Sequence, residues 1–542
     1  MSGTLKEVGV IIGEASSNEF FFSSKPGEMP SRWEYLLTYS EEDIDGALKQ
    51  VEVVAQIERV ISASQALTKE LEFDIIKKLI ESGLADKKVW GKARVLGYLT
   101  GSGDLQQPKK AVMPGKPVYM APAGLLQKFY SYPEIEAVEV GSLITRAEVP
   151  VSLSIKGFRR HLAIIAQTGS GKTYLAGIIV EELLRKGGTL IVLDPHADYV
   201  FLSRRTDGKK HELSDKMTIF RNPASTGRYT EAEVGNVEPY EICFSDLDLD
   251  EIRVICRISR SSVNIINGLR EALSRLKSEK VAFQPEDLSK KLLEAESWGT
   301  GSIDARTIDG AKAAAKYMAR LIKMQVFTSA STGIDKMLRP MHLSVIDLSG
   351  LDDEASDYIA SKILSDVYEK VAEGQFEYPV FVLVEEAHRF IPVDANTYSK
   401  SIIKKIAAEG RKFGVFLILI TQRPSKIHSD ALSQCNSQII MRITNPEDQA
   451  AVAASSERLG QTLLEDLPGL DKGEAVIVGE MTRAPIMAKI RKRTTREGGS
   501  DIDVVSKMKE AMDKAKQETV ENESDRLRKE IRGFMDSGGE KR

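Results

Sequence analysis

A glycine-rich segment in the first third of the chain has the residue types that bind the phosphates of a nucleoside triphosphate. It reads Ala166-Gln-Thr-Gly-Ser-Gly-Lys-Thr173, the apolar residues 161–166 lead into it, and the helix-favouring residues 172–186 follow. A strand, a glycine-rich turn and a helix in this order are typical of a phosphate-binding loop, or P-loop. The pattern predicts an ATP site made by Gln167, Thr168, Gly169, Ser170, Gly171, Lys172 and Thr173.

Each residue type in this segment has a chemical reason. Gly169 and Gly171 let the backbone curl so that its N–H groups point at phosphate oxygens. Lys172 can reach the β- and γ-phosphates, and the Thr173 hydroxyl can bind Mg²⁺. The N-terminus of the following helix adds partial positive charge. Ala166 stands where the pattern usually has glycine, and we expect it to be tolerated if its φ is negative.

A second apolar run, in Tyr378-Pro-Val-Phe-Val-Leu-Val-Glu-Glu-Ala-His388, ends in two carboxylates. In P-loop ATPases the first acid at such a strand end helps to hold Mg²⁺, and the second orients and deprotonates the attacking water. We therefore assign Glu385 to the metal and Glu386 to the catalytic base, although the first acid is more often aspartate. A solvated strand end with incidental acids is the alternative interpretation.

Polar residues beside other predicted strands are candidates for contacts with the phosphates. Gln422 follows the apolar residues 415–420 and is a candidate γ-phosphate sensor, with a polar strand cap as the alternative. Arg411 follows a predicted helix and a glycine, so it can project across a subunit interface toward transition-state charge; a surface salt bridge is the alternative. Arg160, before the P-loop strand, is either a nucleotide contact or solvated. The segment Asp194-Pro-His-Ala-Asp-Tyr199 either helps to position Mg²⁺ or is a structural turn.

The elements that must position these residues change in character along the chain. Short β-branched and aromatic runs with Gly/Pro turns predict a small β-barrel over residues 1–150, interrupted by one amphipathic helix. Apolar runs of five or six residues between helical patterns predict an α/β core with a parallel central sheet over 151–495. Strand signals disappear at about 245–330, which indicates a helical insertion. Residues 496–542 are rich in charges of both signs and predict an exposed helical or flexible tail.

Composition sets limits on the class of protein. The 542 residues include 75 Lys+Arg and 79 Asp+Glu, so the net charge of −4 excludes a globally basic nucleic-acid coat but not a local basic groove. Three separated cysteines and six histidines show no disulfide or zinc spacing. No apolar run approaches the roughly 20 residues of a membrane span, and the first residues lack the apolar core of a signal peptide. We expect a soluble, cytoplasmic protein without a membrane partner.

The order of these motifs resembles the HerA branch of the HerA–FtsK superfamily of ring-shaped DNA motors, over about residues 1–495. The segments that carry the resemblance are Gln167-Thr-Gly-Ser-Gly-Lys-Thr173, Leu193-Asp-Pro-His196, Val384-Glu-Glu-Ala-His388, Glu409-Gly-Arg-Lys-Phe413 and Thr421-Gln-Arg-Pro-Ser425, with a barrel-like start and a helical insertion. The resemblance implies a RecA-like P-loop core after a HAS-barrel. It also implies a homo-hexamer that uses ATP and Mg²⁺ to move along or unwind double-stranded DNA without sequence preference.

The same resemblance implies partners and residue roles. Family members typically act with a NurA-type nuclease in DNA end resection and double-strand-break repair, and some act with other effectors in phage defence. Arg411 is similar to the arginine finger that acts on a neighbouring subunit, and Arg160 to a further interface arginine. The closing strand, residues 484–490, is similar to a segment that approaches the nucleotide through Lys489 and Ile490.

Two alternatives stay open at this point. An FtsK-like or conjugation-type DNA pump is one, and the lack of a membrane span argues against it. The other is an ATP-gated ring scaffold that activates a bound antiviral effector with little translocation; the complete hydrolytic set, Glu386 and Arg411 included, favours a motor. The sequence does not identify the basic residues that would contact DNA in the channel of such a ring. The basic runs at 204–205, 209–210 and 489–496 are candidates, but such runs are more commonly solvated surface.

Overall fold

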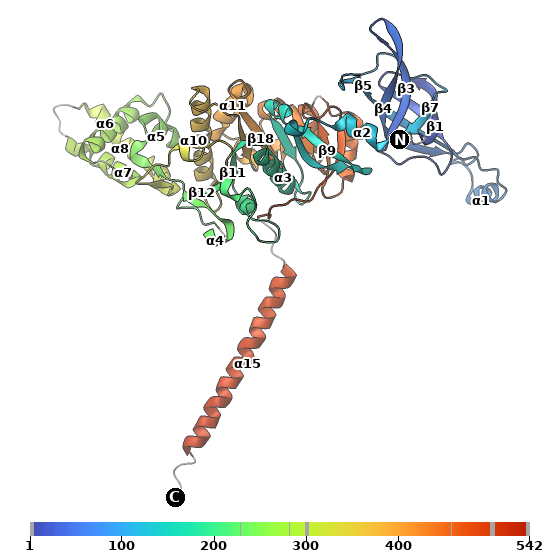
Figure 1. The fold of residues 1–542 in the computed structure, drawn as a ribbon. Helices are drawn as coiled ribbons and strands as arrows, with labels where there is room; N and C mark the ends of the chain where they lie inside the picture. Colours follow the sequence, from blue (N-terminus) through green and yellow to red (C-terminus); the bar gives the residue numbers. More distant parts are fainter. Residues whose placement is uncertain are drawn as a thin grey trace. The chain divides into compact units, whose positions relative to one another are not determined.

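The computed structural model describes residues 5–227, 229–280, 282–298, 303–456, 458–498 and 504–537 (Figure 1). The chain divides into a large unit that extends to Glu497 and a C-terminal unit that begins at Gly498. The large unit contains a β-barrel, an α/β core and a helical insertion.

The N-terminal barrel is a closed sheet of six strands. Its order is β2-β1-β7-β3-β4-β5, and pairing of β2 with β5 closes it. The strands are β1 (Glu7–Ala15), β2 (Glu19–Ser24), β3 (Tyr35–Ile44), β4 (Ala47–Ala63), β5 (Lys88–Leu99) and β7 (Pro117–Met120), with the short β6 (Leu105–Gln106) beside β5. Alternate side chains such as Phe20, Phe22 and Val53 fill the interior. The predicted amphipathic helix is α1 (Phe73–Glu81), inserted between β4 and β5.

The core sheet has the order β13-β12-β16-β11-β17-β18-β10-β19-β20-β21-β8-β9. The strands are β8 (Ala137–Leu143), β9 (Arg146–Ser154), β10 (Leu162–Ile165), β11 (Thr189–Asp194), β12 (Met217–Arg221), β13 (Val237–Pro239), β16 (Leu343–Asp347), β17 (Val380–Val384), β18 (Val415–Thr421), β19 (Ser437–Ile440), β20 (Glu474–Val478) and β21 (Ile486–Ile490). Neighbours from β13 to β19 are parallel, whereas those from β19 to β9 are antiparallel. The RecA-like α/β core is confirmed, but its sheet is mixed rather than wholly parallel. The predicted boundary at residue 150 falls inside β9.

The parallel strands are apolar throughout because helices cover both faces of the sheet. In β10, Leu162 and Ile164 belong to one hydrophobic cluster, and Ala163 and Ile165 belong to another. Helix α3 (Lys172–Arg185) packs in the first cluster. Helices α10 (Asp353–Ala372) and α11 (Ser399–Phe413) pack in the second. The strand that leads to the P-loop is therefore fixed from both sides.

A helical insertion interrupts the core, as predicted for residues 245–330. Its helices are α5 (Leu249–Ile255), α6 (Val263–Glu279), α7 (Pro285–Leu293), α8 (Ala305–Ala315) and α9 (Met318–Met324), and the parallel pair β14 (Ile242–Cys243) and β15 (Phe327–Thr328) joins its two ends. The backbones of α6 and α8 touch, since a Cβ on Gly268 would lie 2.2 Å from Ala311 N. The amphipathic pattern of residues 248–276 predicts one continuous helix, which is wrong: the turn between α5 and α6 contains Arg257, which has a φ of 54°.

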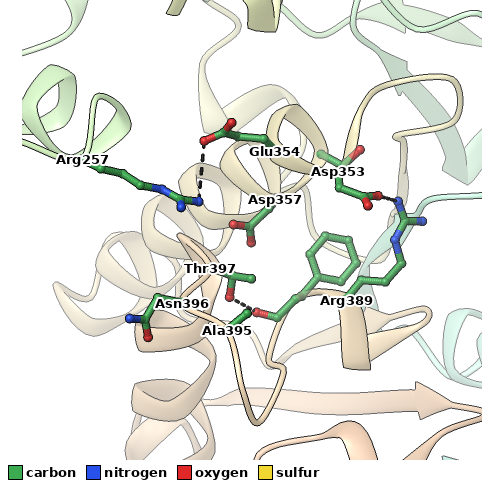
Figure 2. A pocket seen from close by; sticks show the side chains of 10 residues that line it. Arg257, Asp353, Glu354, Asp357, Arg389, Ala395, Asn396 and Thr397 are labelled. Carbon is green, nitrogen blue, oxygen red and sulfur yellow. Dashed lines mark hydrogen bonds and ion pairs between the residues drawn. The ribbon is translucent and has the colours of Figure 1, made fainter. Parts of the chain in front are cut away.

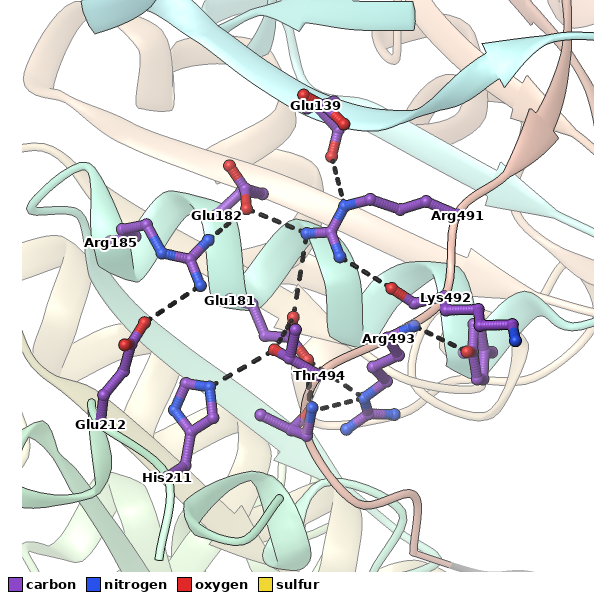
Figure 3. A network of polar contacts seen from close by, with 12 residues as sticks. Glu139, Glu181, Glu182, Arg185, His211, Glu212, Arg491, Lys492, Arg493 and Thr494 are labelled. Atoms are coloured by element: carbon purple, nitrogen blue, oxygen red, sulfur yellow. Dashed lines mark hydrogen bonds and ion pairs between the residues drawn. The ribbon is translucent and has the colours of Figure 1, made fainter. Parts of the chain in front are cut away.

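Residues 491–496, here called the C-terminal strap, lie across the P-loop helix α3 (Figure 3). The side chains of Arg493 and Glu181 are both fully buried and 3.5 Å apart. Thr495 N donates to Glu181 Oε1 at 3.0 Å, and Arg491 donates to Glu182 at 2.9 Å. Two arginines of the basic run at 489–496 are thus bound by carboxylates of this same chain, which supports a structural role for them rather than a DNA contact.

Replacing Arg493 by alanine is expected to destabilise the large unit. The substitution removes the buried cation of the Glu181 carboxylate and leaves only Arg491 at 3.9 Å, and breaking such a buried pair costs about 3–5 kcal/mol. For a unit of this size each kcal/mol shifts the melting midpoint by about 1 °C, so a decrease of about 3–5 °C is expected in a calorimetric scan. The matched control is Arg205→Ala, since the Arg205 side chain is 59% exposed and pairs loosely with Asp207 at 3.7 Å. An equal shift in both variants would contradict the assigned role of the buried pair.

The C-terminal unit is described over α15 (Val504–Ser537), a single helix. Its described side chains are exposed, in keeping with its charged composition. Among the helices of the described residues, none combines the length and the apolar character needed to cross a membrane.

Candidate nucleotide-binding and hydrolysis site

The predicted site residues meet because their strands are parallel neighbours. Strands β11, β17, β18 and β10 lie side by side, and Ile165 at the end of β10 is in register with Thr421 at the end of β18. The carboxyl ends of such strands form one edge of the sheet. The P-loop, the Glu385–Glu386 turn and Gln422 all follow strand ends at this edge.

The P-loop has the backbone that its glycines predict. Gly169 and Gly171 have φ values of 80° and 104°, in the left-handed region that favours glycine. Ala166 keeps a negative φ, so the departure from the usual pattern causes no strain. The Gln167 side chain accepts a hydrogen bond from Thr444 Oγ1 at 2.9 Å, which fixes the start of the loop.

Lys172 connects the P-loop to the acidic turn. Its Nζ donates to Glu385 Oε1 at 2.6 Å and to Glu386 Oε1 at 2.7 Å. Burial opposes the ammonium, but the two carboxylates outweigh that effect and raise the pKa of Lys172. The charge is therefore permanent at the place where it can reach both a γ-phosphate and the carboxylates.

Glu385 is held rigidly and is completely buried. Tyr199 OH donates to its Oε2 at 2.5 Å while Lys172 bonds its Oε1. Thr173, in the first turn of α3, and Glu385 supply the hydroxyl and carboxylate oxygens that Mg²⁺ prefers in P-loop sites. These donors fit the predicted metal.

Glu386 has features expected of a residue that binds water. It is 5% exposed, and its φ of 49° is unusual for a residue with a side chain. Burial would raise its pKa, but the nearby His388 and Lys172 outweigh burial and lower the pKa to about 2. No well-aligned hydrogen bond reaches its buried Oε2 from the described residues. The site thus contains an ionised carboxylate whose Oε2 has His388 Nδ1 at 3.2 Å as its nearest cationic or polar partner among the described residues.

Gln422 and Thr168 meet across the site. Thr168 Oγ1 donates to Gln422 Oε1, so the end of β18 contacts the P-loop directly. His388 Nδ1 lies 3.2 Å from Glu386 Oε2 and 3.2 Å from Thr421 Oγ1. The acidic turn and the predicted sensor strand are therefore coupled through one imidazole.

Lys489 and Ile490, at the end of β21, lie near the P-loop through one intermediate residue. Ile490 N donates to Gly473 O at 2.8 Å, and Gly473 N donates to Ser170 O at 3.0 Å. Lys489 Nζ donates to the backbone oxygen of Lys472 at 3.0 Å. These contacts connect the end of β21 to the P-loop through Gly473, and a contact of either residue with the nucleotide stays a prediction.

The structure does not bring Arg160 and Arg411 to the P-loop of their own chain. Arg160 precedes β10 and pairs with Glu480 at 3.2 Å, and Arg411 lies in the last turn of α11, which precedes β18. Both therefore lie at the amino edge of the parallel sheet, whereas Lys172 follows the carboxyl edge. The four residues of β10 alone separate the two edges by about 13 Å.

The segment 194–199 forms the structural turn that was the alternative interpretation, and it also contacts the site. The buried Asp194 carboxylate accepts backbone N–H groups of His196, Asp198 and Tyr199. Burial, followed by the repulsion of Glu385, raises the pKa of Asp198 to about 7. The roles of Tyr199 and His388 are not visible in the sequence, because they depend on side chains that meet only in the folded protein.

A cavity of about 490 Å³ is lined by residues of α10, of the insertion and of the segment that follows the acidic turn (Figure 2). Arg389, three residues after Glu386, pairs there with Asp353 in the first turn of α10. Arg257 of the helical insertion reaches Glu354 of the same turn at 3.7 Å. Ion pairs at this cavity thus connect the segment after the acidic turn to α10, and α10 to the helical insertion.

Comparisons with known proteins identify the family of this chain. Residues 138–367 match the family model described as the central domain of helicase HerA. The chain is 30% identical to the DNA double-strand break repair helicase HerA of Pyrococcus furiosus, over 93% of this chain and 98% of that protein. It is 27% identical to the HerA of Saccharolobus solfataricus, over 98% and 99%.

Among solved structures, the conjugative coupling protein TrwBΔN70 is similar with a TM-score of 0.47 and 12% identity, over 70% of this chain and 94% of that one. The relationship seen in the motifs is confirmed by the near-complete coverage of the Pyrococcus protein at 30% identity. This chain belongs to the HerA helicase family of P-loop ATPases.

Proposed function

We propose that this protein is a hexameric, ATP-driven DNA translocase or helicase of the cytoplasm that acts with a NurA-type nuclease in DNA end resection and double-strand-break repair. The names of the HerA relatives support the DNA substrate and the repair role. The observation that carries the proposal is the division of the hydrolytic residues between two edges of one sheet. Arg160 and Arg411 can reach a P-loop only if that P-loop belongs to a neighbouring subunit.

In this proposal each nucleotide lies between two subunits. Lys172 and the P-loop N–H groups of one subunit bind the phosphates, and Thr173 and Glu385 hold Mg²⁺, which neutralises phosphate charge when bound. Glu386 orients the attacking water through its carboxylate, whose Oε2 makes no well-aligned hydrogen bond within the described residues. The neighbour's Arg411 stabilises charge on the transferred phosphoryl group.

The contacts of Lys172 explain how phosphate binding can prepare the base. With Lys172 bound to both carboxylates, Glu386 has a pKa of about 2 and is a weak proton acceptor. Drawing the ammonium toward a γ-phosphate removes one of the interactions that keep this pKa low. The same movement therefore makes Glu386 more basic only when a triphosphate is bound.

Release of phosphate can be transmitted along the ion pairs beside the site. Loss of the γ-phosphate changes the contacts of Gln422 and Glu386, and the acidic turn continues into Arg389 and its pair with Asp353. Arg257 then links α10 to the helical insertion. If these elements alternate between two arrangements as ATP is hydrolysed, they would move DNA through the channel of the ring. The DNA would be held there through its phosphates.

The exposed apolar residues of α1 support a protein partner. On this helix of the barrel Phe73 is 77% exposed, and Leu84 just beyond its end is 68% exposed. Ile80 is 54% exposed, and no side chain of α1 is buried. Apolar residues gathered in this way are typical of a surface that another protein covers, and we assign it to the nuclease or effector.

The rate of ATP hydrolysis with and without linear duplex DNA tests the proposal. We expect DNA to stimulate hydrolysis by roughly tenfold and the stimulation to fall steeply as salt rises, because phosphate contacts release counterions. Molar mass in the presence of ATP should be that of six chains. A ring without DNA stimulation that nevertheless activates a bound effector would favour the ATP-gated scaffold, and a monomer would overturn both functions.

A further inference from the structure

His161 has a backbone conformation that a residue with a side chain rarely adopts. Its φ is 57° and its ψ is 156°, a combination found almost only in glycine. The residue is 2% exposed and stands between Arg160 and the first residue of β10. Such strain persists only where the surrounding contacts determine the conformation, and it is concentrated at functional sites.

Both nitrogens of the buried imidazole are used. Leu417 N donates to Nδ1 at 2.9 Å, so Nδ1 carries no proton. Nε2 lies 3.1 Å from the backbone oxygen of Ala407 and therefore donates its proton to it. Burial lowers the pKa of His161 to about 4, so this neutral tautomer persists at neutral pH.

These two hydrogen bonds join the elements that carry the amino-edge arginines. Ala407 lies in α11 one helical turn before Arg411, and Leu417 lies in the following strand β18. Arg160 is the residue before His161, and its backbone oxygen accepts a hydrogen bond from Asn436 N at 3.0 Å. One side chain thus fixes α11 and β18 relative to the start of the P-loop strand.

We propose that His161 is a positioning residue for the pair Arg160 and Arg411. Its imidazole ties the last turns of α11 to the start of β10, so that both arginines face the neighbouring subunit together. Because β10 leads directly into the P-loop, the hydrogen bonds of His161 connect two nucleotide sites. The arginines of a subunit act on the nucleotide bound by its neighbour, whereas its P-loop binds its own nucleotide. This inference rests on the proposed action of Arg411 on a neighbouring subunit.

The variant His161→Asn tests the contact with α11 alone. Asparagine, like histidine, is enriched among residues with a positive φ, so the backbone strain should be similar in the variant. Its Oδ1 can accept the Leu417 N–H in place of Nδ1, but it has no donor at the position of Nε2. We expect kcat for ATP to fall by roughly 10- to 100-fold, while the dissociation constant for a fluorescent ATP analogue changes less than threefold. His342→Asn is the matched control: it replaces another buried histidine, which bonds Thr218 at 3.0 Å, and kcat should stay within twofold.

Mixed rings distinguish a positioning role from a structural one. Subunits with Lys172→Ala contribute intact arginines but a defective P-loop, so mixing them with His161→Asn subunits should restore hydrolysis at shared interfaces, as with Arg411→Ala. If the mixture rescues Arg411→Ala but not His161→Asn, the inference about His161 is overturned while the proposed function stands. An unchanged kcat in His161→Asn has the same consequence. Failure to rescue Arg411→Ala overturns the proposed function on which the inference rests. If His161→Asn does not assemble, His161→Gly, which removes the backbone strain, is used in the same mixture with the same expectations.

Discussion

Replacing Arg411 by alanine is expected to lower kcat for ATP about a thousandfold, within the range typical of arginine fingers. The Arg411 side chain is exposed in the last turn of α11, away from the P-loop of its own chain. Binding of ATP by Lys172 and the loop should therefore stay within a few-fold of the native affinity. Steady-state kinetics together with equilibrium binding of a fluorescent ATP analogue measures both effects.

The control for this prediction is Lys412→Ala, which removes an exposed cation from the same turn and should change kcat less than twofold. Mixing Arg411→Ala with Lys172→Ala subunits should recover hydrolysis, since each variant supplies what the other lacks. Recovery is expected to be largest near equal proportions. A mixture no more active than its components would show that Arg411 acts only within its own subunit.

Replacing Glu386 by glutamine is expected to lower kcat about a thousandfold or more and to leave ATP bound, since the variant lacks the carboxylate that orients and deprotonates water. Binding should be retained or tightened, because one negative charge beside the γ-phosphate is removed. A single-turnover experiment with radiolabelled ATP measures the rate of hydrolysis and the retention of ATP. We expect slow formation of product and prolonged retention of bound ATP. Since the pKa of Glu386 is about 2 before ATP binds, the pH profile of the native kcat/KM, which reports groups of the free enzyme, should show no acid limb from this group above about pH 4.

The matched control is Glu377→Gln, the same substitution at an exposed position just before β17, at the opposite end of that strand. It should leave kcat and ATP binding unchanged within twofold. Rapid hydrolysis by Glu386→Gln would place the catalytic base elsewhere, with Glu385 as the first residue to examine.

The grouping of the candidate site residues could be predicted because each follows an apolar run of strand length. Parallel strands place their carboxyl ends at one edge, so Lys172, Glu386 and Gln422 meet without any knowledge of the strand order. The helical insertion was also predictable, since its periodicity differs from that of the strands. The break after α5 was not, because it depends on a left-handed residue, Arg257, that nothing in the periodicity marks.

Other features depend on contacts between distant residues and could not be predicted. Strands β8 and β9 have the same alternation as barrel strands, and only the pairing of β8 with β21 places this hairpin in the core sheet. The burial of Arg493 against Glu181 is invisible in a run that reads simply as basic. The backbone strain at His161 likewise arises from tertiary hydrogen bonds, not from any local propensity.

The most direct measurement of the central claim is displacement of a third DNA strand from a linear triplex by the purified protein. A motor that couples ATP cleavage between subunits to movement along the duplex should release the third strand with ATP. It should not do so with a non-hydrolysable analogue or with the Glu386→Gln variant. ATP hydrolysis stimulated by the same DNA, with the third strand remaining in place, would contradict the account.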